Sequence, residues 1–213
     1  LRASAGKSLG AFLCQGITLG IFGDANDYVG KGLCGGKIVV RPMVSSPLTS
    51  QANTIIGNTV LYGATSGQLY AAGQAGERFA VRNSGADVVV EGCGANGCEY
   101  MTGGNAVILG PVGSNFGAGM TGGMAFVLDV DDDFAKRANP ENIIWQHLDS
   151  GYWEEHLKSL IASHQRTTGS KWSETILRDW DRWRLRFWQV CPKEMVNRVE
   201  QPLSDKEAIE AAE

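Results

Sequence analysis

The chain has 213 residues, a net charge of −4 and 28 glycines, which is a high glycine content for a globular protein. The weakly acidic balance favours neither nucleic acid nor a membrane as a partner, and no apolar run reaches the roughly 20 residues that a bilayer span requires. The five cysteines are odd in number and scattered, which favours reduced thiols in a cytosolic compartment. We therefore expect a cytoplasmic protein; if the chain is of plant or algal origin, the expected compartment is the plastid stroma.

The composition changes abruptly near residue 130. Residues 1–130 hold 26 of the 28 glycines, 14 of the 42 charged residues and no tryptophan, whereas residues 131–213 hold 28 charged residues and all six tryptophans. We therefore expect two segments of different architecture, 1–130 and 131–213. The chain begins Leu1-Arg2-Ala3-Ser4, without a methionine or an apolar leader, so we expect a cut piece or a processed domain.

The first segment contains a repeat, marked by a glycine that precedes an apolar triplet. Its clearest copies are residues 101–109 and, 19 residues later, 120–128. In chain order the marker glycines are Gly16, Gly36, Gly67, Gly85, Gly104 and Gly123. The single long step, between Gly36 and Gly67, contains the proline- and serine-rich stretch 41–52, which we interpret as a loop inserted between coils.

A second apolar stretch lies about half-way through each repeat, for example at 59–61, 79–81 and 100–101. Both stretches are three to five residues long, β-branched or aromatic, and bounded by glycine or asparagine. We predict a short strand at each place, because no window keeps helical spacing for 11 residues.

Strands this short are stable only when they stack, so we predict an all-β solenoid, a right-handed parallel β-helix, over residues 1–130. The marker glycines would take positive φ and allow neighbouring coils to approach closely. Val39, Val89, Ile108 and Val127 are expected to point inward as one apolar column. A left-handed hexapeptide helix is the rival, and we prefer the right-handed form because the apolar triplets alternate at nine to ten residues rather than six.

For the second segment, residues 131–213, we predict an α-helical extension that packs on the solenoid. We expect helices over 139–147, 151–164 and 170–191. The third helix would carry one apolar face: Trp172, Ile176, Trp180, Trp183 and Phe187. That face should cover the last coil or the flank of the solenoid, and residues from Val199 onward should be frayed or disordered.

Four stretches are specific enough to indicate a family: 23–37, 56–65, 75–86 and 115–123. They resemble the C-terminal domain of the glutamate synthase large subunit, which is named for its G-x-G-x-G repeats. A related domain occurs in formylmethanofuran dehydrogenase. The resemblance is dense over residues 3–130 and looser at His164, 168–170 and Trp180.

The resemblance implies a structural domain at the end of a multidomain enzyme that makes glutamate from glutamine and 2-oxoglutarate. An amidotransferase domain and a synthase domain, the latter with flavin mononucleotide and an iron–sulfur cluster, would be its partners, together with a small electron-transfer subunit or ferredoxin. The resemblance assigns no catalytic, cofactor-binding or metal-binding residue to this segment. The alternative is a free-standing assembly subunit of a split glutamate synthase or of a formylmethanofuran dehydrogenase-like complex.

The chain departs from the whole enzyme of that family. Residue 1 is Leu, where the amidotransferase has a cysteine nucleophile, and the sequence lacks a closely spaced cysteine trio for the cluster. The family's domain also starts earlier than Arg2. An initial coil is therefore expected to be missing through excision, or to be supplied by a partner.

Three sets of residues are of types that can bind a metal, bind a phosphate or form a catalytic triad. Cys93 and Cys98 are only two ligands, so we interpret them as buried or turn cysteines rather than a metal site. The pairs Gly30/Gly32 and Gly117/Gly119 lack the following helix that phosphate binding needs, so we expect coil turns. His147, His156 and His164 show no triad pattern, and residues 1–130 contain no histidine, which disfavours an acyltransferase or ligand-binding solenoid.

A fourth set consists of the few charges in the solenoid: Asp24, Asp27, Lys31, Glu77, Arg78, Arg82 and Glu99. The structural interpretation is ion pairs and loop anchors at the coil corners. The functional interpretation is a docking surface for the synthase or amidotransferase domain. We predict that the chain alone has no enzymatic activity.

Overall fold

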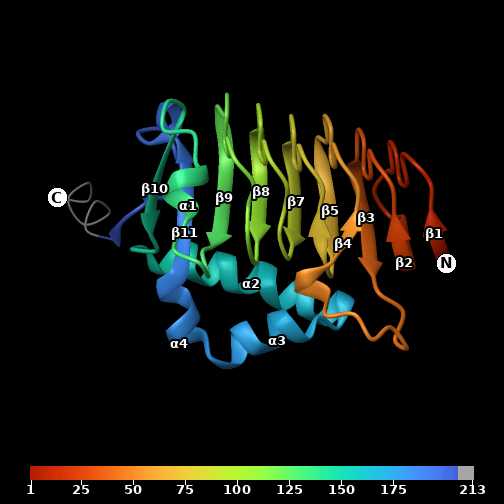
Figure 1. Cartoon of the computed structure of the whole chain (residues 1–213). Coiled ribbons are helices and arrows are strands. Elements are labelled where there is room, and N and C mark those ends of the chain that lie inside the picture. The colour runs from red at the N-terminus through yellow and green to blue at the C-terminus, as the bar shows by residue number, and fades with distance from the viewer. Residues whose placement is uncertain (206–213) are drawn as a thin grey trace.

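The computed structural model describes residues 1–205, and its backbone winds into stacked coils whose strands lie side by side along one axis (Figure 1). Successive strands pair in parallel. They are β1 (Arg2–Ala5), β2 (Thr18–Ala25), β3 (Cys34–Arg41), β5 (Ser66–Ala71), β7 (Ser84–Val90), β8 (Thr102–Ile108) and β9 (Gly122–Leu128). The β-solenoid expected for the first segment is confirmed.

A second side of each coil is a narrow strip of pairing. It includes β4 (Thr54–Ile56) and β6 (Gln74–Ala75). Single residues continue it from coil to coil in the order Ala5, Ala25, Ile56, Ala75, Cys93 and Val112. The loop between β3 and β4, with a 3₁₀ helix at Ser50–Ala52, is the insertion that the long step in the repeat predicts.

The third side of the coil is not a strand, and here the prediction of short strands at 59–61, 79–81 and 100–101 is wrong. Three residues at alternate positions take φ between +53° and +77° in each of six coils. They are 8, 10 and 12; 28, 30 and 32; 59, 61 and 63; 78, 80 and 82; 96, 98 and 100; and 115, 117 and 119. We call this side the left-handed ladder. The prediction failed because apolar content says nothing about the sign of φ.

The left-handed ladder satisfies its backbone by hydrogen bonds between coils. The N–H of Arg82 donates to the carbonyl oxygen of Glu99 at 2.9 Å in the next coil, and the N–H of Cys98 donates back to that of Phe79 at 2.7 Å. These bonds replace the sheet hydrogen bonds that the two β sides make. The ladder therefore holds the coils in register without being a sheet.

The marker glycines serve close approach as well as positive φ. Gly104 and Gly123 have φ of +79° and +80°, whereas Gly85 has no positive φ. A Cβ on Gly85 would nonetheless lie 2.2 Å from the carbonyl oxygen of Thr65, and one on Gly104 would lie 2.3 Å from that of Ala86. Glycine is required at both positions because the neighbouring backbone already occupies the Cβ site.

Side chains alternate between two cores. Ile108 and Val127 point into the solenoid, as expected, together with Val40 and Val90. Val89 lies on the outer face with Val107 and Phe126, and Val39 pairs with Tyr70 of that face, so the prediction that Val39 and Val89 point inward is wrong. A run of three valines hides the alternation of a strand because both faces are buried.

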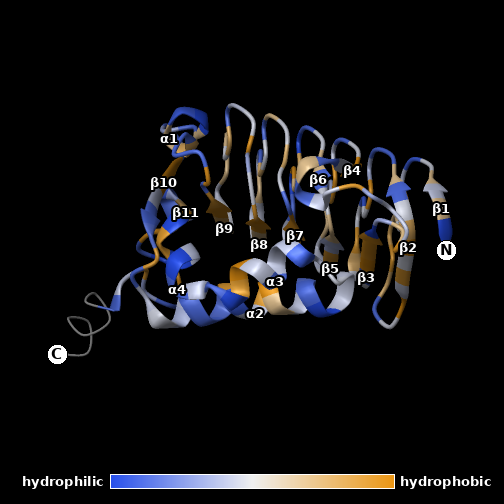
Figure 2. Cartoon of the chain, turned by 60° about the horizontal axis from the view of Figure 1, so that its bottom comes forward, coloured by the Kyte–Doolittle hydropathy of each residue, from blue (hydrophilic) through white to orange (hydrophobic). Residues whose placement is uncertain are grey.

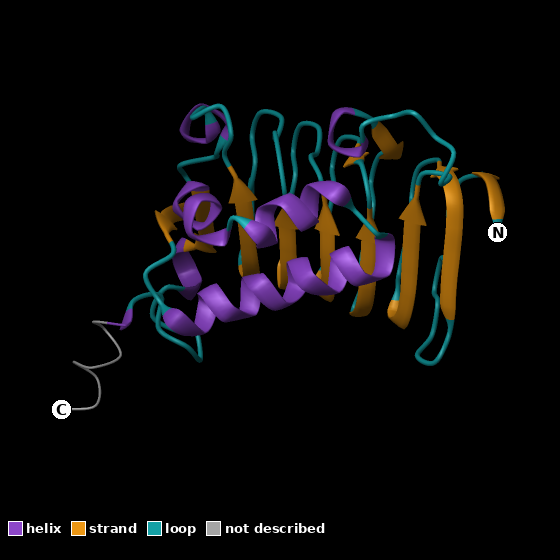
Figure 3. Cartoon of the chain, turned by 90° about the horizontal axis from the view of Figure 1, so that it is seen from below, coloured by secondary structure: helices purple, strands orange, loops and turns teal. Residues whose placement is uncertain are grey.

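Helices cover most of the outer face and leave β1 and β2 uncovered (Figure 3). Helix α2 (Gly151–Thr168) contacts β3, β5, β7 and β8, and α3 (Lys171–Arg178) packs beside α2. The expected helix at 151–164 is thus present and longer. Strands β3, β8 and β9 are mainly apolar, and apolar residues also occupy part of α2 (Figure 2). This second core buries the expected face, with Ile176, Trp180, Trp183 and Phe187 all inside it.

One predicted helix of the second segment is wrong, and the third forms only over the first part of its predicted range. Residues 139–147 contain strand β10 (Ile143–His147), preceded by the one-turn helix α1 (Phe134–Arg137). The third helix breaks at Asp179, where φ is −117° and ψ is 46°, and continues only as α4 (Trp180–Trp183) and a 3₁₀ turn at Arg184–Arg186. The chain then forms strand β11 (Phe187–Pro192).

The physical reason for both corrections is the open edge of the last coil. Strand β11 pairs antiparallel with β9, and β10 pairs antiparallel with β11. An uncovered β9 would expose unpaired backbone groups, so pairing overrides the helical spacing of the apolar residues. Ile143, Ile144 and Trp145 are β-branched or aromatic, and such residues suit a strand as well as a helix.

The expected disorder after Val199 is wrong as far as Asp205. Leu203 is 3% exposed, and the indole Nε1 of Trp153 donates to the carbonyl oxygen of Pro202 at 3.1 Å. The 3₁₀ turn Lys193–Met195 leads into this stretch. Residues 206–213 lie outside the described part of the chain. Among the helices of residues 1–205, none has the length and apolar character that crossing a bilayer demands.

Candidate functional site

The cysteines and glycine pairs occupy structural positions. Cys93 and Cys98 are 7% and 0% exposed. Burial raises the pKa of Cys93 to about 12 and that of Cys98 well above its ordinary value, so both thiols stay protonated. Residues 1–205 contain no group of three or more histidine, cysteine, aspartate or glutamate residues that could hold a metal. These thiols therefore do not fit an iron–sulfur cluster, which needs cysteine thiolates.

Gly30/Gly32 and Gly117/Gly119 are the second and third positions of the left-handed ladder in their coils. Strands β3 and β9 follow them in the chain, in place of the helix that phosphate binding needs. They do not fit the cradle that a flavin phosphate would need. The interpretation of both pairs as coil turns agrees with their backbone.

Most of the predicted charges gather on the outer surface of the left-handed ladder. We call this surface the corner face, and its residues are Lys7, Ser8, Tyr28, Lys31, Thr59, Tyr62, Arg78, Arg82, Glu99, Tyr100 and Asp27. The first eight line a hollow of about 620 Å³. Tyr28 and Tyr100 are 39% and 51% exposed. The corner face is therefore a shallow surface of cations and aromatic rings, the residue types that dominate protein interfaces.

Aromatic rings and cations alternate along the corner face. The guanidinium carbon of Arg82 lies 5.8 Å from the ring centroids of both Tyr62 and Tyr100. Lys31 lies 6.0 Å from the ring of Tyr28. Glycine at position 119 leaves room for the Tyr100 ring, because a Cβ on Gly119 would lie 2.4 Å from that ring. Cation–π contacts of this kind hold the Arg82 guanidinium between tyrosines of the two adjacent coils.

Only part of the charge on the corner face is paired with carboxylates. Nε of Arg78 lies 2.9 Å from Glu99, and Nζ of Lys7 lies 3.4 Å from Asp27. The backbone N–H of Asn58 donates a hydrogen bond to the carboxylate of Asp27. This hydrogen bond is the main reason why the pKa of the Asp27 carboxyl is lowered, and Lys7 lowers that pKa further. Because Lys31 and Arg82 instead contact rings, the face keeps a net positive character.

The other two predicted charges lie apart from this cluster. Asp24 is in β2, where its carboxylate accepts a hydrogen bond from the hydroxyl of Ser4. Glu77 is exposed immediately before Arg78, and its N–H donates to the side-chain oxygen of Asn58 at 2.8 Å. Both belong to coil anchoring rather than to the corner face.

An asparagine ladder next to the corner face was not anticipated. The side-chain N–H of Asn115 donates to the side-chain oxygen of Asn96, and that of Asn139 donates to Asn115, both at 2.9 Å. Asn96 and Asn115 are the first left-handed positions of their coils. Their spacing of 19 residues, equal to the repeat, could have revealed the ladder.

A buried polar cluster joins the solenoid to the helices, and sequence reasoning also missed it. Glu91 and His164 are both 0% exposed, with Nε2 of His164 at 3.5 Å from the Glu91 carboxylate. The same carboxylate accepts a hydrogen bond from Ser170, whose hydroxyl accepts the N–H of Ser173 and caps α3. No sequence pattern signals a pair separated by more than 70 residues.

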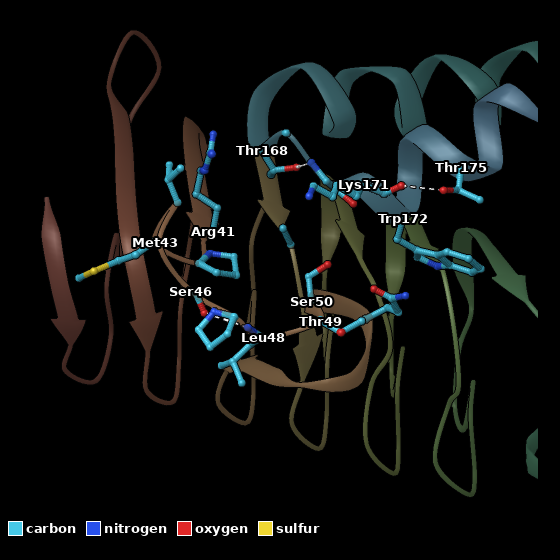
Figure 4. A pocket seen from close by; sticks show the side chains of 17 residues that line it. Arg41, Met43, Ser46, Leu48, Thr49, Ser50, Thr168, Lys171, Trp172 and Thr175 are labelled. Atoms are coloured by element: carbon cyan, nitrogen blue, oxygen red, sulfur yellow. Dashed lines mark hydrogen bonds between the residues drawn. The ribbon is translucent and has the colours of Figure 1, made fainter.

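A cavity of about 550 Å³ lies beside this cluster, between the inserted loop and the junction of α2 and α3 (Figure 4). Arg41 and Lys171 are the two cations that line it, and Trp172 closes one end. The indole of Trp172 donates to the carbonyl oxygen of Leu109 at 2.6 Å. The inserted loop thus forms a wall of a surface recess.

The remaining histidines take part in aromatic packing. His147 stacks on Trp188 with centroids 3.9 Å apart, and His156 lies with Tyr152 and Trp153. The structure brings neither of them to a serine, a cysteine and a carboxylate together. His147 is exposed, and its partner Trp188 packs against the core inside the solenoid, whereas Trp153 beside His156 packs against the second core.

Comparison with known proteins identifies relatives of this chain. The family described as GXGXG motif matches residues 1–193. The chain is 64% identical over 211 residues to the glutamate synthase [NADPH] large chain of Azospirillum brasilense, which covers 99% of this chain and 14% of the relative. It is 54% identical over 194 residues to the ferredoxin-dependent glutamate synthase of Pyropia yezoensis (91% and 13%).

A third relative is the glutamate synthase [NADH] of Schizosaccharomyces pombe, 50% identical over 204 residues, with 96% of this chain and 10% of the relative covered. The chain therefore spans between 10% and 14% of the length of these three relatives.

Proposed function

The chain belongs to the GXGXG motif family, and from that membership we propose that it is a non-catalytic structural segment of a glutamate synthase. It holds the amidotransferase and flavin-dependent synthase domains in place while glutamate is made from glutamine and 2-oxoglutarate, a reaction of nitrogen assimilation. Flavin and the iron–sulfur cluster bind elsewhere in the enzyme. The observation that carries this proposal is that relatives named for three electron donors all match the segment.

Those relatives are named for NADPH, ferredoxin and NADH, and they are 64%, 54% and 50% identical to this chain. A segment that keeps at least half of its residues in all three forms fits a role that these forms share. The packing supports a rigid spacer, because backbone hydrogen bonds join neighbouring coils and both faces of β5, β7, β8 and β9 carry buried side chains.

The corner face is the surface that we propose for docking on the neighbouring domains. It presents Tyr28, Tyr62, Tyr100 and Arg82, and tyrosine and arginine carry most of the binding energy at protein interfaces. Its net positive character fits a partner surface rich in carboxylates or carbonyl oxygens.

A direct assay tests the non-catalytic role. The 213-residue chain should form no glutamate from glutamine and 2-oxoglutarate with NADPH, NADH or reduced ferredoxin, and it should contain no flavin by fluorescence. Turnover by the flavin-free chain would overturn the proposal.

Docking is tested by adding the chain in trans to a large chain that lacks the corresponding segment. Arg82→Ala and Tyr100→Ala should each weaken the association about 30-fold, the loss typical of an interface hot spot. Arg178→Ala, an exposed arginine on α3, is the matched control and should change it by less than about threefold. Equal behaviour of all three variants would place docking on another surface.

A further inference from the structure

Cys14 and Cys34 lie at equivalent places in the first two coils, and neither contributes to the sites described above. Their backbones pair as a parallel bridge, and their Sγ atoms are 3.6 Å apart. Both side chains are exposed, whereas Cys93, Cys98 and Cys191 are buried. The carbonyl oxygen of Phe12 lies 3.5 Å from Sγ of Cys14 and 3.6 Å from Sγ of Cys34 and can accept a hydrogen bond from either thiol, so the two sulfurs converge on one point.

We propose that Cys14 and Cys34 form a reversible dithiol–disulfide site, which a disulfide-bearing oxidant such as glutathione disulfide converts into a covalent link between the first two coils. Disulfides need Cα atoms about 4.4–6.8 Å apart. Paired strands lie about 4.7–4.9 Å apart, so the parallel bridge already meets this condition. Closing the bond requires rotation of the two thiols, with little movement of the backbone.

The reaction is a balanced thiol–disulfide exchange. One thiolate of the pair attacks a sulfur of the oxidant, the oxidant's S–S bond breaks, and the first oxidant thiol leaves. The neighbouring thiolate then attacks the protein sulfur of this mixed disulfide, forms the Cys14–Cys34 bond and releases the second oxidant thiol. Two protein thiols are oxidised, one disulfide is reduced, and the two protons that the protein loses are gained by the two released thiols.

The surroundings favour ring closure over a stable mixed disulfide. The second thiol is held in contact with the first, which gives it a high effective concentration. The hydrogen bond with Cys14 raises the pKa of the Cys34 thiol, so exchange should accelerate as the pH rises above neutral. The three buried cysteines cannot compete for the oxidant.

Packing does not require thiols at these two places. Ser66 pairs with Cys34 in the next coil, so a serine fits the same position of the repeat. The link would close residues 14–34 into a loop that contains Tyr28 and Lys31 of the corner face. Oxidation would therefore restrain one end of that face, independently of whether it docks on another domain.

The test is a redox titration of the unmodified full chain in buffers of glutathione and glutathione disulfide, followed by acid quenching, alkylation and peptide mapping. Toward the oxidising end, we expect alkylation of Cys14 and Cys34 to be lost together as a linked peptide appears, and dithiothreitol to restore both. Cys93, Cys98 and Cys191 should stay reduced. Amide exchange within residues 14–34 should slow about tenfold on oxidation.

Cys14→Ser and Cys34→Ser are matched controls, since Ser66 already occupies the equivalent place. Each should lose the linked peptide and accumulate glutathione on the remaining cysteine, with an unchanged circular dichroism spectrum. The proposal is overturned if both cysteines of the unmodified chain are alkylated at the most oxidising ratio. It is equally overturned if each carries glutathione without ring closure, or if the link forms only between two chains.

Discussion

Twelve residues other than glycine occupy left-handed positions of the ladder, and they include Leu61, Tyr100 and Arg82. Each costs about 1–2 kcal/mol relative to an ordinary conformation. Hydrogen bonds to the coils above and below offset this cost, and so do contacts such as the stacking of Arg82 between two tyrosines. Single residues in this protein therefore tolerate strain wherever the adjacent coils determine the backbone.

Gly104→Ala and Gly63→Ala separate steric clash from backbone strain. Both glycines have positive φ, but a Cβ on Gly104 would lie 2.3 Å from a carbonyl oxygen, whereas one on Gly63 has no neighbour within 4 Å. Gly63→Ala should lower the free energy of unfolding by about 1 kcal/mol and Gly104→Ala by about 3 kcal/mol or more. Urea denaturation measures both, and equal losses would contradict the clash.

Because burial raises the pKa of the Cys93 thiol, we predict that the protein loses stability at alkaline pH. In the folded chain the pKa of Cys93 is raised from 9.0 to about 12, so its contribution is complete below pH 9 and is lost as the pH rises toward 12. The free energy of unfolding should fall by about 1 kcal/mol per pH unit in this window. Cys93→Ala should flatten the profile between pH 9 and 11, and an unchanged slope would contradict the assignment.

At the level of the helices and strands, pairing partners decide which element forms. Trp180, Trp183 and Phe187 have helical spacing, yet Phe187 begins a strand because β9 offers an unpaired edge. Helix α2 persists as expected because it lies on a continuous apolar surface of Tyr70, Val89, Val107 and Phe126.

Phe187→Ala tests the strand that closes the solenoid. Phe187 is 0% exposed where β11 meets β9, so truncation should cost about 3–5 kcal/mol and increase aggregation on heating. Leu185→Ala, two residues earlier and 62% exposed, is the control and should change stability by less than about 0.5 kcal/mol. Similar midpoints of thermal unfolding for both variants would refute the capping role.

The Glu91–His164 pair tests how the helices are attached to the sheet. Removing either partner leaves a buried polar group without its neighbour, so Glu91→Ala or His164→Ala should each cost about 3 kcal/mol or more. The double variant should cost clearly less than the sum, because neither group is then left alone. A double-mutant cycle on urea unfolding measures the coupling, and strict additivity would exclude it.

For the molecule as a whole, the proposed spacer role depends on regular stacking. The coils repeat along one axis, the helices run along their outer face, and β10 and β11 close one end (Figure 1). Such an object has a defined length and few internal hinges. Geometry of this kind suits the separation of two other domains better than it suits a catalytic cleft.

Exchanging the segment between relatives examines this role directly. Replacing the matching part of the ferredoxin-dependent glutamate synthase of Pyropia yezoensis with this chain should preserve activity with reduced ferredoxin within about threefold and confer no activity with NADPH, because a spacer does not choose the donor. Steady-state rates with each donor provide the measurement. A change of donor preference would show that the segment contributes to electron transfer.

The solenoid and its inserted loop were predictable from the repeat of glycines and apolar triplets, because a period near 19 residues leaves few other ways to bury short strands. The candidate site was predictable only in part. The charges of the corner face are rare in a neutral segment and therefore visible, but their pairing with Tyr62 and Tyr100 depends on which side chains the coils bring together.

Three features came only from the packed chain. The sign of φ along the ladder follows from hydrogen bonds between coils, the conversion of Phe187–Pro192 to a strand follows from an open sheet edge, and Glu91 meets His164 because α2 crosses the outer face. Local propensity records how one residue affects its near neighbours, whereas each of these contacts joins residues about 20 to 70 positions apart. The sequence alone therefore did not predict these three features, because each depends on long-range contacts.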